Sequence, residues 1–515
     1  MLAISLFAAG CAGLPPNVMR ASSLAHPASL ETTLGRIAAA SSPDPSSSGF
    51  RLLASSPFAL ATRLELIRRA ERSLDLQYFL IQSDTTGRAF LRALRDAARR
   101  GVRIRLLLDD INTAGQDELL LGLAAEPNVE VRLFNPFPAG RDTFVTRFAS
   151  SLSQFERLNH RMHNKLFIAD SAMAVAGGRN IADEYFSRRE LANFIDLDVF
   201  VTGSVVGQLA SLYDVYWNSQ PAYPIESIVK ARSSVSERLA AFDRATAHSQ
   251  MPTLGGSSPT DVLGYGPISE ELDDGKLGLL WGGAEAFADP PSAVSESDFQ
   301  APADHRDERP VRFNVFEHIR EATSEVMLVT PYLIPGPGGM ALFRDARARG
   351  VKVSILTNSL ASTDQALVHA GYRRYRKPLL EAGVELYELS AVKANRTSRW
   401  RLPKAAVGGL HAKAAIFDRN EVFVGSMNLD PRSEHYNTEL GIIFHSPELA
   451  REALRLTDFT KSQAAHRLTQ APDGSLRWVG PAGSDDGTHE NEPETDFWTR
   501  TLLDLLGPFA PEELL

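Results

Sequence analysis

Apolar and polar positions follow a regular order through the first half of the chain, and that order predicts strand and helix in turn. Phe50–Ala54 has the apolar content of a strand, and apolar residues then recur at helical spacing over Pro57–Ala70. The elements expected next are a strand at Leu74–Ile81, a helix at Gly87–Arg100 and a strand at Val102–Asp109. Alternation at this length predicts an α/β layer structure with right-handed crossovers.

The second half of the chain repeats this order. Its expected elements are a helix at Phe313–Ala322, a strand at Val326–Ile334, a helix at Gly339–Arg349 and a strand at Val351–Thr357. Gly101 and Gly350, which follow equivalent helices, are 249 residues apart (350−101). The repeat predicts a duplicated α/β domain whose copies face each other about a pseudo-twofold axis.

A short motif occurs once in each copy. His163–Asp170 reads HNKLFIAD and His411–Asp418 reads HAKAAIFD. Each motif continues through a pair of small residues to Asn180 or Asn428, seventeen residues after its His (180−163 and 428−411). Apolar runs on both sides of turn residues predict that each motif is a β-hairpin, with its His strand at the interface of the two copies.

The two motifs supply the candidate catalytic set, which is His163, Lys165, Asp170, His411, Lys413 and Asp418. Residues two apart in a strand project from one face, so we expect each His to lie beside its Lys. Each Asp lies at the turn of its hairpin, a position that favours a bracing role over contact with substrate.

Four further residues are candidates for supporting the site. Asn180 and Asn428 follow small residues at the start of expected helices, where they would cap the helix or bind a phosphate oxygen. Asp198 and Glu439 lead into apolar strands. Each is a candidate to accept the Nδ1 hydrogen of a catalytic His and so to fix its tautomer.

This set of side chains suits the exchange of phosphodiesters. One neutral imidazole attacks phosphorus and forms a phosphohistidine, while the other, protonated, gives its proton to the leaving oxygen. The ammonium groups and amides stabilise the non-bridging oxygens. This chemistry needs no metal and no cofactor, so none is expected.

Composition limits the partners and the number of domains. A chain of 515 residues exceeds the size of a single core. The expected divisions are 1–48, a signal-like segment and tether; 49–220, the first α/β domain; 221–276, a linker with a helix; 277–465, the second α/β domain; and 466–515, an extension with an apolar helix. A net charge of −9 gives no reason to expect nucleic acid as a partner.

The single cysteine, Cys11, follows an apolar run and small residues, as in the lipobox of bacterial lipoproteins. The run lacks a preceding Lys or Arg, and Ala8 replaces the usual Leu. An incidental cysteine in a short apolar terminus is therefore the alternative to a lipid anchor. The apolar helix near the C-terminus has two similar alternatives, since its face either packs on the protein or enters a lipid surface.

The duplicated motif resembles the signature of the phospholipase D superfamily over roughly residues 49–465. Longer strings are similar to bacterial cardiolipin synthase C: GVRIRLLLDDIN at Gly101–Asn112, RMHNK at Arg161–Lys165, GGRNI at Gly177–Ile181, LTNSLASTDQALVHAGY at Leu356–Tyr372, GVELYEL at Gly383–Leu389 and NLDPRS at Asn428–Ser433. The resemblance implies paired mixed-sheet domains that share one active site, and transfer of a phosphatidyl group through a phosphohistidine, with His163 the favoured nucleophile.

The resemblance also implies phospholipid substrates at the membrane of a bacterial envelope. Phosphatidylglycerol is the expected acceptor, and phosphatidylethanolamine is a possible donor. Hydrolysis of phospholipid, or of a nucleic-acid phosphodiester, uses the same residues and stays open, as does the oligomeric state. Other residues are open between substrate contact and a structural role: His160, His369, Tyr372, Arg179, Arg188, Arg189 and Arg432.

Overall fold

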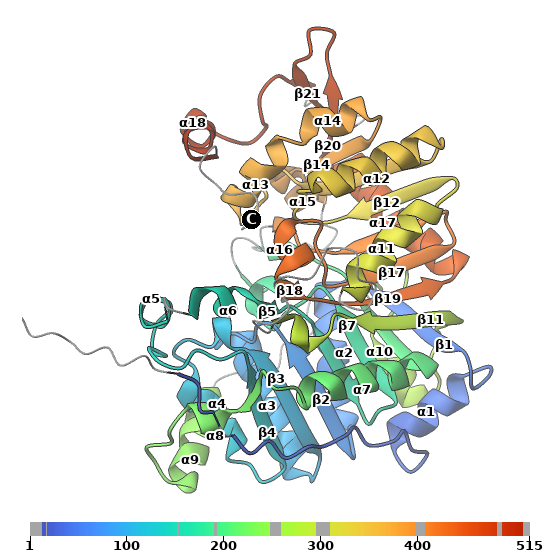
Figure 1. Ribbon diagram of the computed structural model, residues 1–515. Helices are drawn as coiled ribbons and strands as arrows, with labels where there is room; N and C mark the ends of the chain where they lie inside the picture. The colour runs from blue at the N-terminus through green and yellow to red at the C-terminus, as the bar shows by residue number, and fades with distance from the viewer. Residues whose placement is uncertain are drawn as a thin grey trace, which may run out of the picture.

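The computed structural model describes residues 13–16, 18–151, 154–189, 193–247, 259–294, 309–397, 407–481 and 487–507. Two α/β halves are stacked, with the second uppermost in Figure 1 and the motif hairpins near the boundary between them. The expected duplicated α/β architecture is confirmed. Cys11 lies outside the described residues.

The first half contains most of the elements that the apolar pattern predicts. In chain order its principal elements are β1 (Ser48–Leu53), α2 (Ser56–Arg69), β2 (Ser73–Tyr78), α3 (Thr85–Arg99), β3 (Arg103–Asp109), α4 (Asp117–Ala124), β4 (Val129–Phe134), β6 (Leu166–Ala169), β7 (Met173–Gly177), β9 (Asp198–Gly203), α7 (Ser204–Trp217) and β10 (Ala222–Pro224). The hairpin β6–β7 is the first motif.

The second half repeats these elements and adds to them. They are β11 (Leu280–Ala288), α11 (Pro310–Glu321), β12 (Glu325–Val329), α12 (Gly336–Ala348), β13 (Lys352–Asn358), α13 (Ala366–Arg373), α14 (Arg376–Glu381), β14 (Glu385–Leu389), β16 (Ala414–Phe417), β17 (Glu421–Gly425), β19 (Leu440–His445), α17 (Pro447–Ala464), β20 (Ala465–Gln470), β21 (Leu476–Val479) and β22 (Thr488–His489). The second motif forms the hairpin β16–β17.

The strands pair in one continuous order that is mirrored about its centre. The first half runs β10-β4-β3-β2-β6-β7-β9-β1, and the second runs β11-β19-β17-β16-β12-β13-β14-β20 before β21 and β22. The halves join where β1 pairs with β11, with Gly49 opposite Trp281. Equivalent strands therefore lie at equal distances from the join, as a duplicated domain requires.

One hydrophobic core is shared by both halves at this join. Phe50 and Leu52 of β1 pack in the same cluster as Leu440, Ile442 and Phe444 of β19. The rings of Phe50 and Phe444 lie 4.8 Å apart, and both side chains are fully buried. Burying each stabilises the fold by about 1.5–3 kcal/mol, so the halves are held as one body.

The N-terminal segment corrects the expectation of a flexible tether over residues 12–48. Its described part lies along the first half, where the carbonyl oxygen of Ala21 accepts from Arg132 and the hydroxyl of Ser23 accepts from Trp217. A helix, α1 (Thr33–Ser41), buries Leu34 in the main core. The segment is rich in Ser and Pro because it runs over the surface, but it is bound to the first half.

The segment expected as a linker also packs on the first half. It contains α8 (Ile225–Ile228), α9 (Val235–Thr246) and α10 (Ile268–Asp274). Phe242 of α9 is buried against α4. The approach is close at Gly122 of α4, because a Cβ added there would lie 2.8 Å from the Cβ of Phe242. No helix of the described residues is both long and apolar enough to cross a bilayer.

The two motif aspartates brace the fold. Asp170 accepts hydrogen bonds from the backbone N–H groups of Glu71, Arg72 and Ser73, at the start of β2. Asp418 does the same at the start of β12, from residues 323 to 325. Each residue has positive φ at its hairpin turn. Their geometry agrees with the bracing role that their turn position favours.

Replacing Asp418 with Ala is expected to lower the free energy of unfolding by about 1 kcal/mol, the usual effect of losing a capping side chain. Burial alone would raise the pKa of Asp418. Hydrogen bonds from Thr323, Glu325 and Ser324 outweigh that effect and hold the pKa well below its usual value. Its contribution is therefore present above the unfolded-state pKa and lost as pH falls below about 4. Denaturant melts at pH 7 and pH 3 measure both effects.

The matched control is Asp458→Ala, which removes an exposed carboxylate that pairs with Lys461 on the same helix. A variant Asp418→Ala that keeps its full stability but loses turnover would show that the carboxylate acts in catalysis instead.

Candidate active site

Two short parallel strand pairs cross between the halves and position the histidines. β5 (Arg161–Met162) pairs with β18 (Asn437–Thr438), and β15 (Val407–Leu410) pairs with β8 (Asn193–Ile195). Each pairing ends at a motif His, because the backbone N–H of His163 donates to Thr438 O at 2.9 Å and that of His411 donates to Ile195 O at 2.8 Å. Each His is therefore held against the opposite half.

Each histidine pairs with a carboxylate of the other half. Nδ1 of His163 lies 3.0 Å from Glu439 Oε2, and Nδ1 of His411 lies 2.7 Å from Asp196 Oδ2. Each carboxylate accepts a hydrogen bond from Nδ1–H, which fixes the hydrogen on that nitrogen. In the neutral ring, Nε2 therefore keeps a free lone pair. The site is thus composite, and neither half contains a complete His–carboxylate pair.

Asp198, the expected partner of a histidine, has another role. It forms ion pairs with Arg63 at 3.0 Å and Arg179 at 3.2 Å, and all three side chains are buried. The halves change register between the motif and this strand. The histidines are 248 residues apart (411−163), but Gly441 occupies the strand position of Asp198, an offset of 243 (441−198). That offset makes Asp196 the counterpart of Glu439.

The two carboxylates lie in different surroundings. Glu439 accepts from the hydroxyl of Ser433 at 2.8 Å and from that of Ser426. Burial raises the pKa of Glu439 to about 7. Burial acts in the same direction on Asp196, but the neighbouring charges of His411 and Lys413 lower its pKa to about 2. At neutral pH, Asp196 is a full negative charge and Glu439 is partly protonated.

A glycine gives Asp196 its space. A Cβ added at Gly178 would lie 2.0 Å from Asp196 Oδ1, so any larger residue would displace the carboxylate. Ser426 occupies the equivalent position in the second half and donates to the longer side chain of Glu439. The Gly-Gly and Gly-Ser pairs after the two hairpins are therefore matched to Asp and Glu respectively.

The motif lysines lie beside the histidines, as expected for residues two apart. Lys165 Nζ donates to His163 O at 2.6 Å, and Lys413 Nζ donates to His411 O. Both are buried, and burial lowers the pKa of both amines, that of Lys413 to about 8. An incoming phosphate would restore their preference for the charged form, so the site is suited to an anion.

Both imidazoles are enclosed by aromatic rings, and their surroundings favour the neutral form over the charged one. Phe79 packs on His163 with ring centroids 5.1 Å apart, and Tyr185 packs on His411 at the same distance. The histidines are 8% and 7% exposed. Burial, followed by the charge of the neighbouring Lys, lowers the pKa of each imidazole.

Asn180 and Asn428 lie in the site but cap no helix. Ala182 and Asp430 hold the capping positions after them. The side-chain oxygen of each Asn is buried without a hydrogen-bond partner among the described residues. Asn180 donates to the hydroxyl of Tyr185 at 3.0 Å. These oxygens can accept a hydrogen bond from a substrate hydroxyl, whereas a phosphoryl oxygen would have to be bound by the Nδ2 hydrogens.

Several of the open residues belong elsewhere. His369 lies 2.9 Å from a guanidinium nitrogen of Arg376, whose guanidinium also pairs with Glu388 and lies over the ring of Tyr372. This buried cluster ties the C-terminal segment to the second half through Glu492. The ring of His160 packs at a tilt against that of Tyr436, with the centroids 5.1 Å apart.

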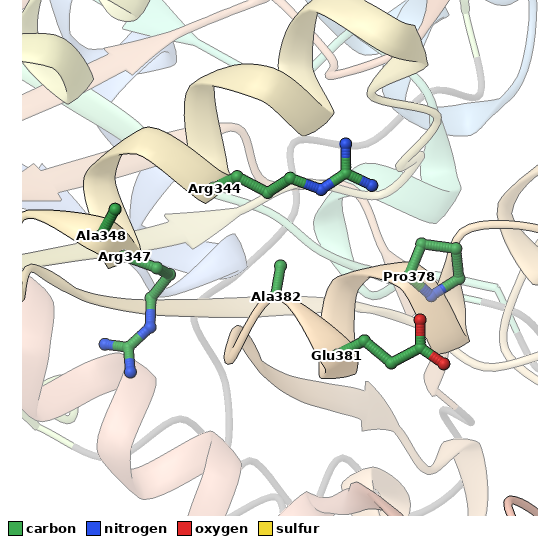
Figure 2. Close-up of a pocket in the computed structure, with 6 residues that line it drawn as sticks. All are labelled: Arg344, Arg347, Ala348, Pro378, Glu381 and Ala382. Carbon is green, nitrogen blue, oxygen red and sulfur yellow. The ribbon is translucent and has the colours of Figure 1, made fainter.

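A hollow on the second half is separate from this site. Figure 2 shows its lining residues, which are Arg344, Arg347 and Ala348 of α12 and Pro378, Glu381 and Ala382 at α14. It lies between two surface helices and contains none of the motif residues. Arg347 is engaged in the fold, because its guanidinium donates to Val351 O at 2.8 Å.

Comparisons with known proteins match both halves. A family model described as cardiolipin synthase, PLD-like domain, matches residues 64–212 and 315–458. Cardiolipin synthase C of Escherichia coli is 36% identical over 467 residues, covering 89% of this chain and 94% of that protein. Cardiolipin synthase A of Pseudomonas fluorescens is 26% identical and covers 84% of this chain and 74% of its own length.

A solved structure shares the whole fold. The crystal structure of phosphatidylserine synthase from Haemophilus influenzae aligns over 91% of this chain and 95% of its own, with a TM-score of 0.57 and 13% identity. This likeness shows that the paired-domain arrangement extends over nearly the full length of the chain.

Replacing Asp196 with Asn is expected to reduce turnover about 10²–10⁴-fold while the protein stays folded, because the tautomer and charge state of His411 are no longer fixed. A carboxylate stabilises the imidazolium, so its loss lowers the pKa of His411 further. Because protonated His411 is the general acid of the first step, the alkaline limb of the pH–rate profile for that step therefore moves to lower pH. Steady-state rates from pH 5 to 9 measure this shift.

Asp198→Asn is the matched variant, two residues away. It leaves Arg63 and Arg179 buried without their carboxylate and is expected to cost about 3–5 kcal/mol of stability. The folded fraction should keep its pH profile. If Asp198→Asn moved the profile and Asp196→Asn did not, the assignment of Asp196 would be wrong.

Proposed function

We propose, from the premise that the chain belongs to the family of cardiolipin synthases built from phospholipase D-like domains, that it makes cardiolipin from phosphatidylglycerol and a second phospholipid. It is an enzyme of phosphatidyl transfer within the phospholipase D superfamily. The observation that carries the finer proposal is the pair of enclosed histidines, each oriented by a carboxylate of the other half.

The first step forms a phosphohistidine. Nε2 of His163 attacks the phosphorus of the donor lipid, and the bond to the headgroup oxygen breaks. That oxygen takes a proton from the imidazolium form of His411, which Asp196 stabilises. Lys165 and Lys413 neutralise the phosphoryl oxygens as charge develops there.

The second step returns the histidine and makes the product. Neutral His411 takes the proton from the hydroxyl of an incoming phosphatidylglycerol, and that oxygen bonds to phosphorus as the phosphorus–nitrogen bond breaks. The new lipid carries two phosphodiesters joined by glycerol. The assignment of His163 as nucleophile follows the family resemblance, since each histidine has a carboxylate and a lysine beside it.

Hydrolysis is the alternative outcome of the same intermediate. A water molecule in place of the lipid hydroxyl would release phosphatidic acid. The near-complete burial of both imidazoles and the aromatic side chains around them support transfer to a lipid, because bulk water has little access to the intermediate.

Purified enzyme given labelled phosphatidylglycerol, with and without phosphatidylethanolamine, tests the reaction. We expect cardiolipin as the main product in both mixtures. Release of ethanolamine in the second mixture would identify phosphatidylethanolamine as a donor. Phosphatidic acid without cardiolipin would instead assign the chain to hydrolysis.

Brief incubation with phosphatidylglycerol labelled in its phosphate, followed by alkaline quenching, tests the intermediate. We expect label on a peptide that contains His163. His411→Ala is expected to slow both formation and breakdown of the phosphoenzyme, whereas His163→Ala should abolish it. Label found only on the His411 peptide would reverse the two roles.

We further propose that the enzyme works at the membrane of a bacterial envelope and that a lipid anchor at Cys11 helps to hold it there. The support is a set of exposed apolar side chains. On α18 (Phe497–Leu506), Trp498, Leu502 and Leu505 form one exposed stripe, and Trp498 is 77% exposed. The opposite face docks through Leu503 on Leu360 and Ala370.

A second apolar group extends this surface to the first half. Phe144 and Val145 of α5 (Phe144–Ala149) and Phe155 of α6 (Phe155–Asn159) are each more than half exposed. α5, α6 and α18 lie on the same side of the molecule in Figure 1. α6 leads directly into β5 and His163, so this surface adjoins the site. Aromatic side chains of this kind favour a lipid–water interface.

The double variant Trp498→Ser and Leu502→Ser is expected to weaken binding to phosphatidylglycerol vesicles roughly tenfold or more, since each large side chain contributes about 1.5–3 kcal/mol when buried. Turnover on lipid dispersed in detergent should change much less. Phe459→Ser, an exposed residue of α17, is the control. Co-sedimentation measures the binding, and equal losses in all variants would exclude α18 as the contact.

A further inference from the structure

The duplicated halves differ in charge at one position beside the site. The motif offset of 248 residues pairs Asn428 with Asn180, and it pairs Arg432 with Glu184 (432−248). His, Lys and Asn are kept in both copies, but here one copy carries a cation and the other an anion. A residue needed only to support the duplicated fold would not need to change sign.

The two side chains also differ in their partners. Glu184 is paired with Arg189 at 3.0 Å. The guanidinium of Arg432 donates to Asn159 Oδ1 at 3.4 Å, and it forms no ion pair with any carboxylate of the described residues. Removal from water normally requires that a guanidinium be paired. Arg432 is therefore a mostly enclosed cation with unused hydrogen-bonding capacity.

Hydrogen bonds place Arg432 on the His163 side of the site. The next residue, Ser433, donates to Glu439 at 2.8 Å, and Glu439 accepts from His163. Asn159, the partner of Arg432, ends α6 only four residues before His163 (163−159). Arg432 thus lies where α16 (Pro431–His435) of the second half meets α6 of the first.

Neighbouring charges leave Arg432 positive. Arg161 and Asp109 form a buried ion pair at 2.6 Å and cancel each other. Asp430 uses its carboxylate to accept from the backbone of Ser433 at 2.7 Å. Burial raises the pKa of Asp430 to about 7, so it is a weak counter-ion. The remaining neighbour, Tyr436, contributes a phenol and no carboxylate.

We infer that Arg432 binds the non-reacting phosphodiester of the acceptor lipid and thereby selects an anionic acceptor. The inference rests on the proposed function, in which the product contains two phosphodiesters joined by glycerol. Lys165 and Lys413 hold the phosphate that reacts, so a second anion needs a cation beyond them. Arg432 supplies that cation where α16 meets α6 within the shared site, whereas the equivalent position of the first half holds Glu184.

One reaction mixture tests the inference. Phosphatidylglycerol is the sole lipid and ethanol is added as an uncharged acceptor, so that cardiolipin, phosphatidylethanol and phosphatidic acid form from the same intermediate. Arg432→Gln is expected to lower the ratio of cardiolipin to phosphatidylethanol about tenfold, because only the lipid acceptor uses the guanidinium. Arg432→Lys should restore part of the ratio.

Arg451→Gln, an exposed arginine of α17 paired with Glu448, is the matched control and should keep the wild-type ratio. Equal losses of cardiolipin and phosphatidylethanol in Arg432→Gln would overturn the inference. If that variant gives no folded protein, an unchanged ratio in Arg432→Met, which keeps the apolar stem without the charge, overturns it. Wild-type enzyme that makes phosphatidic acid and no cardiolipin would instead refute the proposed function.

Discussion

The bond between each catalytic histidine and a carboxylate of the opposite half is the contact on which the rest of the site depends. It fixes which ring nitrogen carries hydrogen, and it requires the halves to meet in one register. The short pairings β5–β18 and β8–β15 provide that register, and the shared core around Phe50 and Phe444 keeps it. Shifting one half along the other would separate both pairs at once.

The site is formed by two copies of one motif, and its two sides differ in their side chains. The two carboxylates differ in length, in hydroxyl donors and in the direction of their pKa shifts, so the two histidines have unlike partners. Arg432 and Glu184 extend the difference outward from the histidines. A reaction with two unlike steps, one that releases a headgroup and one that accepts a lipid, needs such a difference between its two sides.

The repeat in the sequence was enough to predict the duplicated α/β fold, the hairpins and the bracing position of Asp170 and Asp418. Apolar spacing and turn residues report local structure, and these features are local. The partner of His411 is not local. The sequence predicts Asp198 as that partner instead of Asp196. The reason is that the offset between the halves changes from 248 to 243 residues after the hairpin, a change that the strand pairing shows. Aligning the pair Asp196-Leu197 with the pair Glu439-Leu440 would have found it.

The most direct test of the composite site is the Nδ1 hydrogen resonance of each catalytic histidine in protein labelled at histidine with nitrogen-15. Glu439→Gln is expected to move the resonance of His163 upfield and to leave that of His411 in place, because the charged hydrogen bond lost belongs to His163. Asp196→Asn should do the reverse. If Glu439→Gln changed only His411, which belongs to its own half, the exchange of carboxylates between the halves would be contradicted.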